Sequence, residues 1–261
     1  MDNLQVLTAK NVTFLSQIGL IATDVDGTLT HQGGFKAELL VALEKLQAID
    51  LPVMIATGRS AGWVSGLAHY LPVIGAIAEN GGIYVSKTHP ELIFLQPIDD
   101  VAQHRQQLAH QFKVMRQRYP HLAEATDNRF RLTDWTFDVA GLSPTDLDWM
   151  AECCKANGWG FIYSSVQCHI KPLTQEKAHG LGQVLGRDFP DLPRNQVLTV
   201  GDSPNDESLF DASQFPHSVG VANVRHYLAR LRHQPAYLTQ AEAGEGFCEL
   251  VNLLLRQKLR V

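Results

Sequence analysis

Residues 18–30 read IGLIATDVDGTLT, and this stretch decides the expected fold. Its apolar first half, residues 18–23, predicts a buried β-strand. Asp24 and Asp26 follow this strand directly, and Gly27 allows the chain to turn sharply after them. In an open parallel sheet, ligands bind in the crevice at the carboxyl ends of the strands. We therefore expect this strand end to form part of a binding or catalytic site.

Outside this stretch, short apolar runs alternate with helical patterns, which indicates βαβ units and a parallel sheet. In the first half of the chain, the expected helices and strands are residues 36–48, 51–56, 60–70 and 73–78. The pattern resumes after Pro172, where the main expected elements are residues 175–189, 196–200, 218–221 and 247–259. The sequence therefore predicts the α/β class, with a Rossmann-like parallel sheet as the core domain.

The residues between these two halves follow a different pattern. Two short paired strands, a long helix, a strand, a second helix and a last strand are expected over residues 82–86, 92–95, 99–119, 129–140, 143–157 and 159–171. This mixture predicts an α+β domain inserted into the first one. We expect residues 1–83 and 171–261 to form the core domain, and residues 84–170 to form a cap over it.

The composition is typical of a globular protein, because 45% of the residues are hydrophobic and 19% are charged. A net charge of −5 offers no basic surface for nucleic acid. No stretch approaches the ~20 apolar residues that a membrane-spanning helix needs. The four cysteines show neither a disulfide framework nor a CxxC spacing. We expect a cytoplasmic protein that binds neither nucleic acid nor membranes, and its oligomeric state stays open.

Further polar residues follow other strands of the expected sheet, namely TGR at 57–59 and, after a later strand, Asp202 and Asp206. Together with Asp24 and Asp26, these bring four carboxylates to one edge of the sheet. Converging carboxylates repel one another unless a cation holds them together. Oxygen ligands without a nearby His or Cys favour Mg²⁺, for which Asp24, Asp202 and the backbone carbonyl of Asp26 are suitable.

Four sequence motifs resemble those of the haloacid dehalogenase-like phosphatases: DVDGTLT at 24–30, ATGRS at 56–60, a lysine beyond the insert, and GDSPND at 201–206. An insert between the second and third motifs resembles the subgroup that includes the Cof-type and sucrose-phosphate phosphatases. The resemblance implies a phosphoric monoester hydrolase that requires Mg²⁺. Its substrate would be a small phosphorylated metabolite, such as a sugar or polyol phosphate, and its intermediate an aspartyl phosphate.

The same resemblance implies roles for single residues. Asp24 would attack phosphorus, and Asp26, positioned with the help of Thr28, would act first as acid and then as base. The implied metal ligands are Asp24, Asp26, Asp202 and Asp206. The implied phosphate contacts are Thr57, Gly58 and Asn205. A lysine would neutralise negative charge on the nucleophile and on the phosphoryl group.

Several assignments keep an alternative. Lys177 would lie in the first turn of a helix that Thr174 caps, whereas Lys171 ends a strand, and we favour Lys177 as the third-motif lysine. Arg59 is either a surface residue or a substrate contact. Asn80 either forms a tight turn into the cap or borders the substrate.

Substrate specificity is expected to come from the cap. Because side chains alternate along a strand, we expect five side chains of the cap to face the site: Arg129, Arg131, Ser164, Ser165 and His169. Two other functions remain as alternatives, a phosphomutase of the same superfamily and a catalytically silent binding protein. TGRS weakly disfavours the mutase, and the four aspartates of the site argue against a silent protein.

Overall fold

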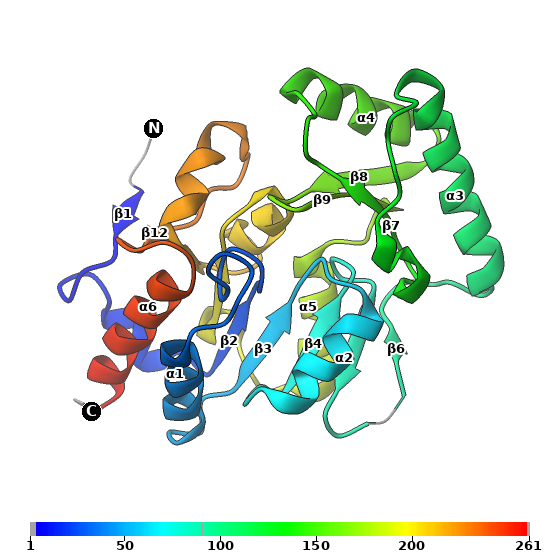
Figure 1. The fold of residues 1–261 in the computed structure, drawn as a ribbon. Coiled ribbons are helices and arrows are strands. Elements are labelled where there is room, and N and C mark those ends of the chain that lie inside the picture. Colours follow the sequence, from blue (N-terminus) through cyan, green and yellow to red (C-terminus); the bar gives the residue numbers. More distant parts are fainter. Residues whose placement is uncertain (1–3, 90, 260–261) are drawn as a thin grey trace.

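The core is one large sheet with helices on both faces (Figure 1). The computed structural model describes residues 4–89 and 91–259. The strands lie in the order β1-β12-β11-β10-β2-β3-β4-β5-β6. Their bounds are Gln5–Val6 (β1), Leu20–Thr23 (β2), Val53–Ala56 (β3), Gly75–Ala78 (β4), Ile83–Ser86 (β5), Ile93–Phe94 (β6), Val197–Gly201 (β10), His217–Gly220 (β11) and Tyr237–Leu238 (β12). All pairs are parallel except those that β5 forms with β4 and β6.

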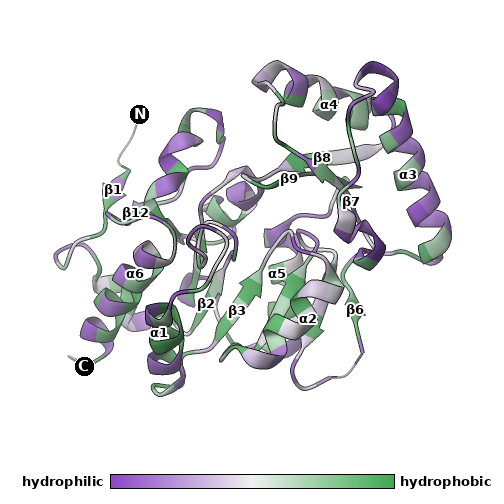
Figure 2. Cartoon of the chain, viewed as in Figure 1, coloured by the Kyte–Doolittle hydropathy of each residue, from purple (hydrophilic) through white to green (hydrophobic). Residues whose placement is uncertain are grey.

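Two hydrophobic layers hold the helices on the sheet. One lies under α1 (Ala37–Gln47), α2 (Ala61–Tyr70) and α6 (Ala243–Lys258). The other lies under α5 (Lys177–Asp188) on the opposite face. All four residues of β2 are buried because both faces of this strand are covered. Figure 2 shows the hydrophobic residues gathered in the strands and on the helix faces turned toward them.

The order of the strands reverses between β2 and β10. From β2 the chain proceeds to β3 and β4 on one side, and after the insert it proceeds from β10 to β11 and β12 on the other side. Such a switch point opens a crevice at the carboxyl ends of its two strands. Val200 pairs with Thr23, so the residues that follow leave the sheet side by side. This register brings Asp24 close to Asp202.

The cap is a three-stranded antiparallel sheet covered by two helices, and it occupies the upper right of Figure 1. Its strands lie in the order β7-β9-β8, with bounds Trp135–Asp138, Gln167–Pro172 and Trp159–Tyr163. Helices α3 (Val101–Arg118) and α4 (Pro144–Ala156) pack on one face through a hydrophobic cluster that contains Phe112 and Phe137. Ser143 begins α4 with a capping box to Asp146, as its sequence suggests.

The structure corrects three expectations for the insert. The single strand expected over 159–171 is a hairpin, because residues between β8 and β9 turn around Ser164. Of the strand expected over 129–140, only β7 forms, since the preceding residues fold into a 3-10 helix, Thr126–Phe130. The boundary expected at residue 84 also differs, because β5 and β6 hydrogen-bond to the core sheet.

The N-terminal residues add an edge to the sheet. β1 pairs with β12, and Leu7 and Leu15 are buried in the core. The 3-10 helices η1 to η6 are Thr13–Gln17, Thr126–Phe130, Arg194–Gln196, Pro204–Phe210, Ala222–His226 and Leu228–Arg230. Among the described residues, no helix has both the length and the apolar character needed to cross a membrane.

Candidate active site

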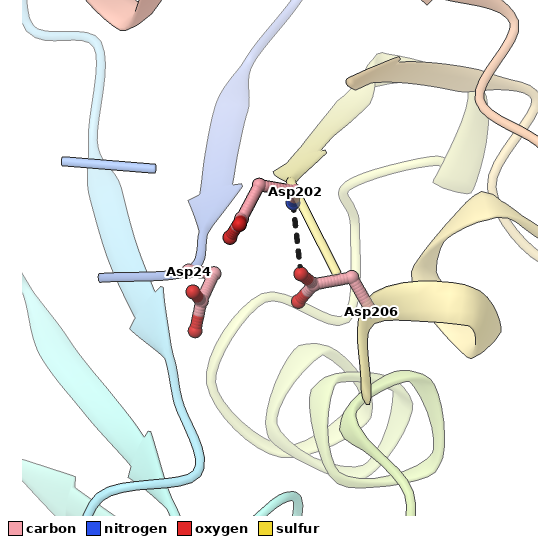
Figure 3. A group of neighbouring side chains, drawn as sticks. All are labelled: Asp24, Asp202 and Asp206. Atoms are coloured by element: carbon pink, nitrogen blue, oxygen red, sulfur yellow. Dashed lines mark hydrogen bonds between the residues drawn. The ribbon is translucent and has the colours of Figure 1, made fainter. Parts of the chain in front are cut away.

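Three carboxylates meet at the switch point. Asp24 follows β2, Asp202 follows β10, and Asp206 belongs to η4. One oxygen atom of each lies within 4.8 Å of the others, and all three residues are buried. Figure 3 shows their side chains gathered around one point. The backbone N–H of Asp24 donates to the carbonyl of Val200 at 3.0 Å, which ties the two strand ends together.

Lys177 is the cation of this cluster. Its Nζ lies 2.7 Å from Asp24 Oδ1 and 2.7 Å from Asp206 Oδ1, and its side chain is fully buried. The other candidate, Lys171, lies in β9 of the cap and forms neither contact. Helix α5 begins at Lys177, and its N-cap residue is Glu176. The prediction that Thr174 is the N-cap of this helix is therefore wrong. The hydroxyl of Thr174 instead donates to Gln96.

The charges of the cluster leave room for a divalent cation. Three buried carboxylates surround one buried ammonium, so two negative charges have no counterpart among these four groups. Burial and the neighbouring carboxylates raise the pKa of Asp24 to about 7, although Lys177 opposes this rise. Burial, with the charges of Asp24 and Asp206, also raises the pKa of Asp202. The donor set, oxygen atoms only, is the one that Mg²⁺ prefers.

Backbone and side-chain donors fix two of these carboxylates. Asp206 Oδ2 accepts from the backbone N–H groups of Asp202 and Ser203, at 2.9 and 3.1 Å. Asp202 accepts from the hydroxyl of Thr28 at 3.0 Å and from Asn223 Nδ2 at 2.8 Å. Thr28 therefore positions Asp202, a carboxylate of the expected metal site. It does not position Asp26, as the family resemblance implied. The sequence analysis did not predict the contact of Asn223 with Asp202. The position of Asn223 shortly after β11, at the same edge of the sheet, could have indicated it.

Arg59 holds Asp26. Its Nε and Nη2 atoms lie 2.7 and 2.6 Å from the two carboxylate oxygens of Asp26, and its guanidinium stacks over Trp63. Neither of the alternatives proposed for Arg59 included this pair. Because its carboxylate is bound by Arg59, Asp26 is not one of the three converging side chains. A metal contact through its backbone carbonyl stays a prediction.

The predicted phosphate-binding residues line a small pocket beside Asp24. Thr57, Gly58 and Asn205 face it, together with the cap residue His169, and the space measures about 10 Å³. That volume holds about one water molecule. Asn80 supports the lining, since Asn205 Nδ2 donates to its side-chain oxygen at 3.0 Å. A side chain at position 58 would crowd His169, because a Cβ atom there would lie 3.1 Å from His169 Cε1.

Comparisons with known proteins agree with this arrangement. The sequence model of the haloacid dehalogenase-like hydrolases matches residues 21–131. The phosphoglycolate phosphatase of Methanothrix thermoacetophila is 26% identical over 252 residues, 90% of this chain and 96% of that protein. Phosphoglycolate phosphatase 1 of Saccharolobus solfataricus is 28% identical over 246 residues, 92% of this chain and 96% of that protein. Over the matched residues the chain is similar to the haloacid dehalogenase-like hydrolases.

A solved structure shares the fold of this chain. The sucrose-phosphatase of Synechocystis, in complex with sucrose and phosphate, matches 91% of this chain and 98% of its own, with a TM-score of 0.66 and 17% identity. The predicted α/β class, a Rossmann-like core with an inserted cap, is thereby confirmed.

The cap directs only part of the expected set of five side chains toward the site. His169 and Ser164 line the space beside Asp24. Arg131 is buried, but it donates to Asp127, Asp134 and the carbonyl of Gly58, so its guanidinium ties the cap to the loop that follows β3. The remaining two, Arg129 and Ser165, are exposed.

Glu79 makes a second link between core and cap, which the sequence did not reveal. This buried residue adopts a left-handed φ of 52° after β4. Its carboxylate accepts from the backbone N–H groups of Ala61 (3.1 Å), Leu132 (3.0 Å) and Thr133 (2.6 Å). Burial raises the pKa of Glu79. These bonds hold the start of α2 and the cap in one fixed position.

Proposed function

We propose that this chain is a Mg²⁺-dependent phosphatase that hydrolyses a small phosphorylated metabolite through a phosphorylated Asp24. The observation that carries the proposal is the buried contact of Lys177 with both Asp24 and Asp206, beside Asp202, at the switch point of the sheet. The relatives are named phosphatases, which supports hydrolysis rather than a mutase reaction. The complete set of carboxylates supports a catalytic rather than a silent protein.

The geometry suggests which oxygen atom attacks. Oδ1 of Asp24 accepts from Lys177, whereas Oδ2 accepts no hydrogen bond from the described residues. A bond forms between Oδ2 and phosphorus while the bond from phosphorus to the leaving oxygen breaks, and Asp26 gives that oxygen a proton. Asp26 then takes a proton from water, the water oxygen bonds to phosphorus, and the Oδ2–phosphorus bond breaks. Phosphate leaves and both aspartates return to their starting states.

Mg²⁺ would be held by Asp24 and Asp202, with Asp206 close to both, and would supply positive charge against the phosphoryl oxygens. Lys177 keeps Asp24 oriented and neutralises part of its charge. Arg59 must release Asp26 when substrate binds, because its guanidinium occupies both carboxylate oxygens of Asp26.

Two substrate classes are supported. The fold shared with a sucrose-phosphatase favours the sugar or polyol phosphate expected from the sequence. The two relatives named phosphoglycolate phosphatase favour a small phosphorylated acid. In both classes the reacting group is a phosphate monoester on a small molecule.

Phosphate release from a panel of such monoesters tests the proposal. With Mg²⁺ we expect turnover of at least one sugar phosphate, polyol phosphate or phosphorylated acid, and of an aryl phosphate. EDTA should abolish it, and excess Mg²⁺ should restore it, because without Mg²⁺ the negative charge that Lys177 leaves unbalanced in the cluster repels the phosphoryl group. Activity that is indifferent to EDTA would refute the metal assignment. Failure of every monoester, including aryl phosphates, would refute the phosphatase.

The raised pKa of Asp24 predicts how stability depends on pH. Without metal, the folded protein keeps a proton on Asp24 that the unfolded chain has lost, so stability should fall as pH rises from about 4 to about 7. Mg²⁺ competes with that proton, so its stabilising effect should grow over the same range. At pH 8, Mg²⁺ at ~100 Kd should add about 2.7 kcal/mol, or ~5–10 °C in Tm.

Thermal melting at pH 5.5 and 8, with Mg²⁺ and with EDTA, measures this effect. Asp24→Asn is the matched control, because its amide cannot titrate, and the increase with pH should be smaller in this variant. An equal gain in Tm from Mg²⁺ at both pH values in the native protein would contradict the assignment of Asp24 to the metal site.

A further inference from the structure

Asp134 holds the ring of His169 in one orientation. Both residues are buried, and His169 Nδ1 lies 2.8 Å from Asp134 Oδ2. The two carboxylate oxygens of Asp134 also accept from Arg131 Nη1, at 2.9 and 3.0 Å. Burial opposes ionisation of Asp134, but the charge of Arg131 and the bond from His169 lower its pKa. Asp134 is therefore a carboxylate, which can only accept, so the proton of this bond lies on Nδ1.

The second ring nitrogen of His169, Nε2, is then a hydrogen-bond acceptor. Burial lowers the pKa of His169, and the positive charges of Arg131 and Lys177 also lower it, against the attraction of Asp134. The ring is therefore neutral and carries one proton, which lies on Nδ1. A neutral imidazole with a protonated Nδ1 has a lone pair at Nε2.

His169 faces the reaction centre. Along β9 its neighbours Cys168 and Ile170 pack into the hydrophobic cluster of the cap, so His169 points to the opposite face. There it lines the same pocket as Asp24 and Asp26. Nε2 has no hydrogen-bond partner among the residues that the structure describes, although it is not sealed from the pocket. An unpaired acceptor thus lies in the pocket of the two aspartates of the proposed reaction.

The other polar side chains that the cap places in this pocket are engaged. Ser164 Oγ accepts from two backbone N–H groups of its own turn, at 3.1 and 3.2 Å. Gln167 Oε1 accepts from Arg131 at 3.0 Å, and its Nε2 donates to Asp127 at 3.4 Å. Among the described residues of the cap, His169 Nε2 is therefore the acceptor in this pocket that a ligand can pair.

We propose that His169 determines specificity: its Nε2 accepts a hydrogen bond from a hydroxyl on the leaving group, and Asp134 is the positioning residue that fixes its ring. This inference rests on the proposed phosphatase function and assigns a residue to substrate selection. The hydroxyl lies close to the ester oxygen, because Asp26 protonates that oxygen in the same pocket. A carboxylate offers no proton to Nε2, so of the two supported classes the sugar or polyol phosphates are favoured over the phosphorylated acids.

Two substrates of nearly equal size test this inference. 2-Hydroxyethyl phosphate carries such a hydroxyl, and propyl phosphate has a methyl group in its place. We expect the native protein to prefer the hydroxyl by at least ~10-fold in kcat/KM, because the methyl group leaves a buried acceptor unpaired. His169→Asn keeps an amide that can donate to Asp134 but lacks Nε2, so the ratio should fall to within about threefold. The same substitution at His110, exposed on α3, is the matched control and should keep the native ratio.

Asp134→Asn tests the positioning role. Arg131 would hold the amide oxygen, so the amide N–H would donate to His169 Nδ1, and the ring proton would move to Nε2. An Nε2–H group can donate to a carboxylate, so kcat/KM for 2-phosphoglycolate relative to 2-hydroxyethyl phosphate should rise at least ~10-fold. Damage to the fold would instead lower both values together. Long-range ¹H–¹⁵N NMR of the native protein should show the proton on Nδ1, in the signals that are missing from His169→Asn.

The outcomes separate failure of the specificity role from failure of the proposed function. A native protein without preference for the hydroxyl, or His169→Asn with the native ratio, would overturn the role of His169. A proton on Nε2 in the native protein would overturn the acceptor, and an unchanged ratio of acid to hydroxyl in Asp134→Asn would overturn the positioning role. Turnover of 4-nitrophenyl phosphate without turnover of 2-hydroxyethyl phosphate would overturn the hydroxyl contact. Failure on every one of these esters would overturn the phosphatase itself.

Discussion

Asp24→Asn is expected to lower kcat by about 10⁴-fold or more for every phosphate monoester, since loss of a catalytic nucleophile has cost ~10⁶-fold elsewhere. The amide keeps the size of the side chain and an oxygen that can accept from Lys177, but it cannot form the bond to phosphorus. The variant should also lose most of the stabilisation by Mg²⁺. Initial rates with saturating substrate, together with melting curves, measure both effects.

The fold itself should survive this change. Burial and the neighbouring carboxylates raise the pKa of Asp24 to about 7, so a neutral amide at pH 8 relieves repulsion in the metal-free protein. We expect metal-free Asp24→Asn to melt at or above the native protein. Asp191→Asn, an exposed aspartate outside the site, is the matched control and should keep full activity. Activity of Asp24→Asn within tenfold of native would show that another group attacks phosphorus.

Asp26→Asn is expected to separate the two halves of the reaction. With an alkyl phosphate the departing oxygen needs a proton, so the first half should slow by the ~10²–10⁴-fold that a general acid contributes. An aryl leaving group is stable without that proton, so phosphorylation of Asp24 should survive better than its hydrolysis, which still requires a base. The variant should therefore release a burst of phenol and then turn over slowly. Stopped-flow absorbance measures the burst.

The pair between Asp26 and Arg59 requires its own control. Asp26→Asn leaves the guanidinium of Arg59 without its carboxylate, and a displaced Arg59 could bind phosphate and slow the reaction by itself. The double variant Asp26→Asn, Arg59→Gln removes that effect. It should show the same burst as the single variant. Equal slowing of alkyl and aryl substrates in both variants, without a burst, would assign the acid and base role to another group.

The sequence predicted the fold because its signals were local and repeated. Apolar runs identified the central strands, and the polar residues after each run had to meet, since parallel strands share one edge. The placement of Asp24 beside Asp202 follows from that rule. The hairpin at Ser164 was missed because β8 and β9 read as one continuous strand when their turn carries no Gly or Pro.

Contacts between side chains on distant elements could not be predicted from the sequence. Lys171 and Lys177 are six residues apart, and only the path of the chain from β9 into α5 decides which of them reaches Asp24. The Arg59 pair with Asp26 spans two loops of the core, and the contacts of Glu79 join the core to the cap. Such contacts depend on the register between distant elements, which no local pattern encodes.

A phosphoryl group on Asp24 is the central claim, and mass spectrometry after a rapid acid quench tests it most directly. Asp26→Asn should be mixed with an aryl phosphate and quenched within the phenol burst, and its peptides should then be compared with those of the unreacted protein. The account predicts one added phosphoryl group on the peptide that carries Asp24, and none in the variant that also carries Asp24→Asn. A burst without that modification, or a phosphoryl group on any other residue, would contradict it.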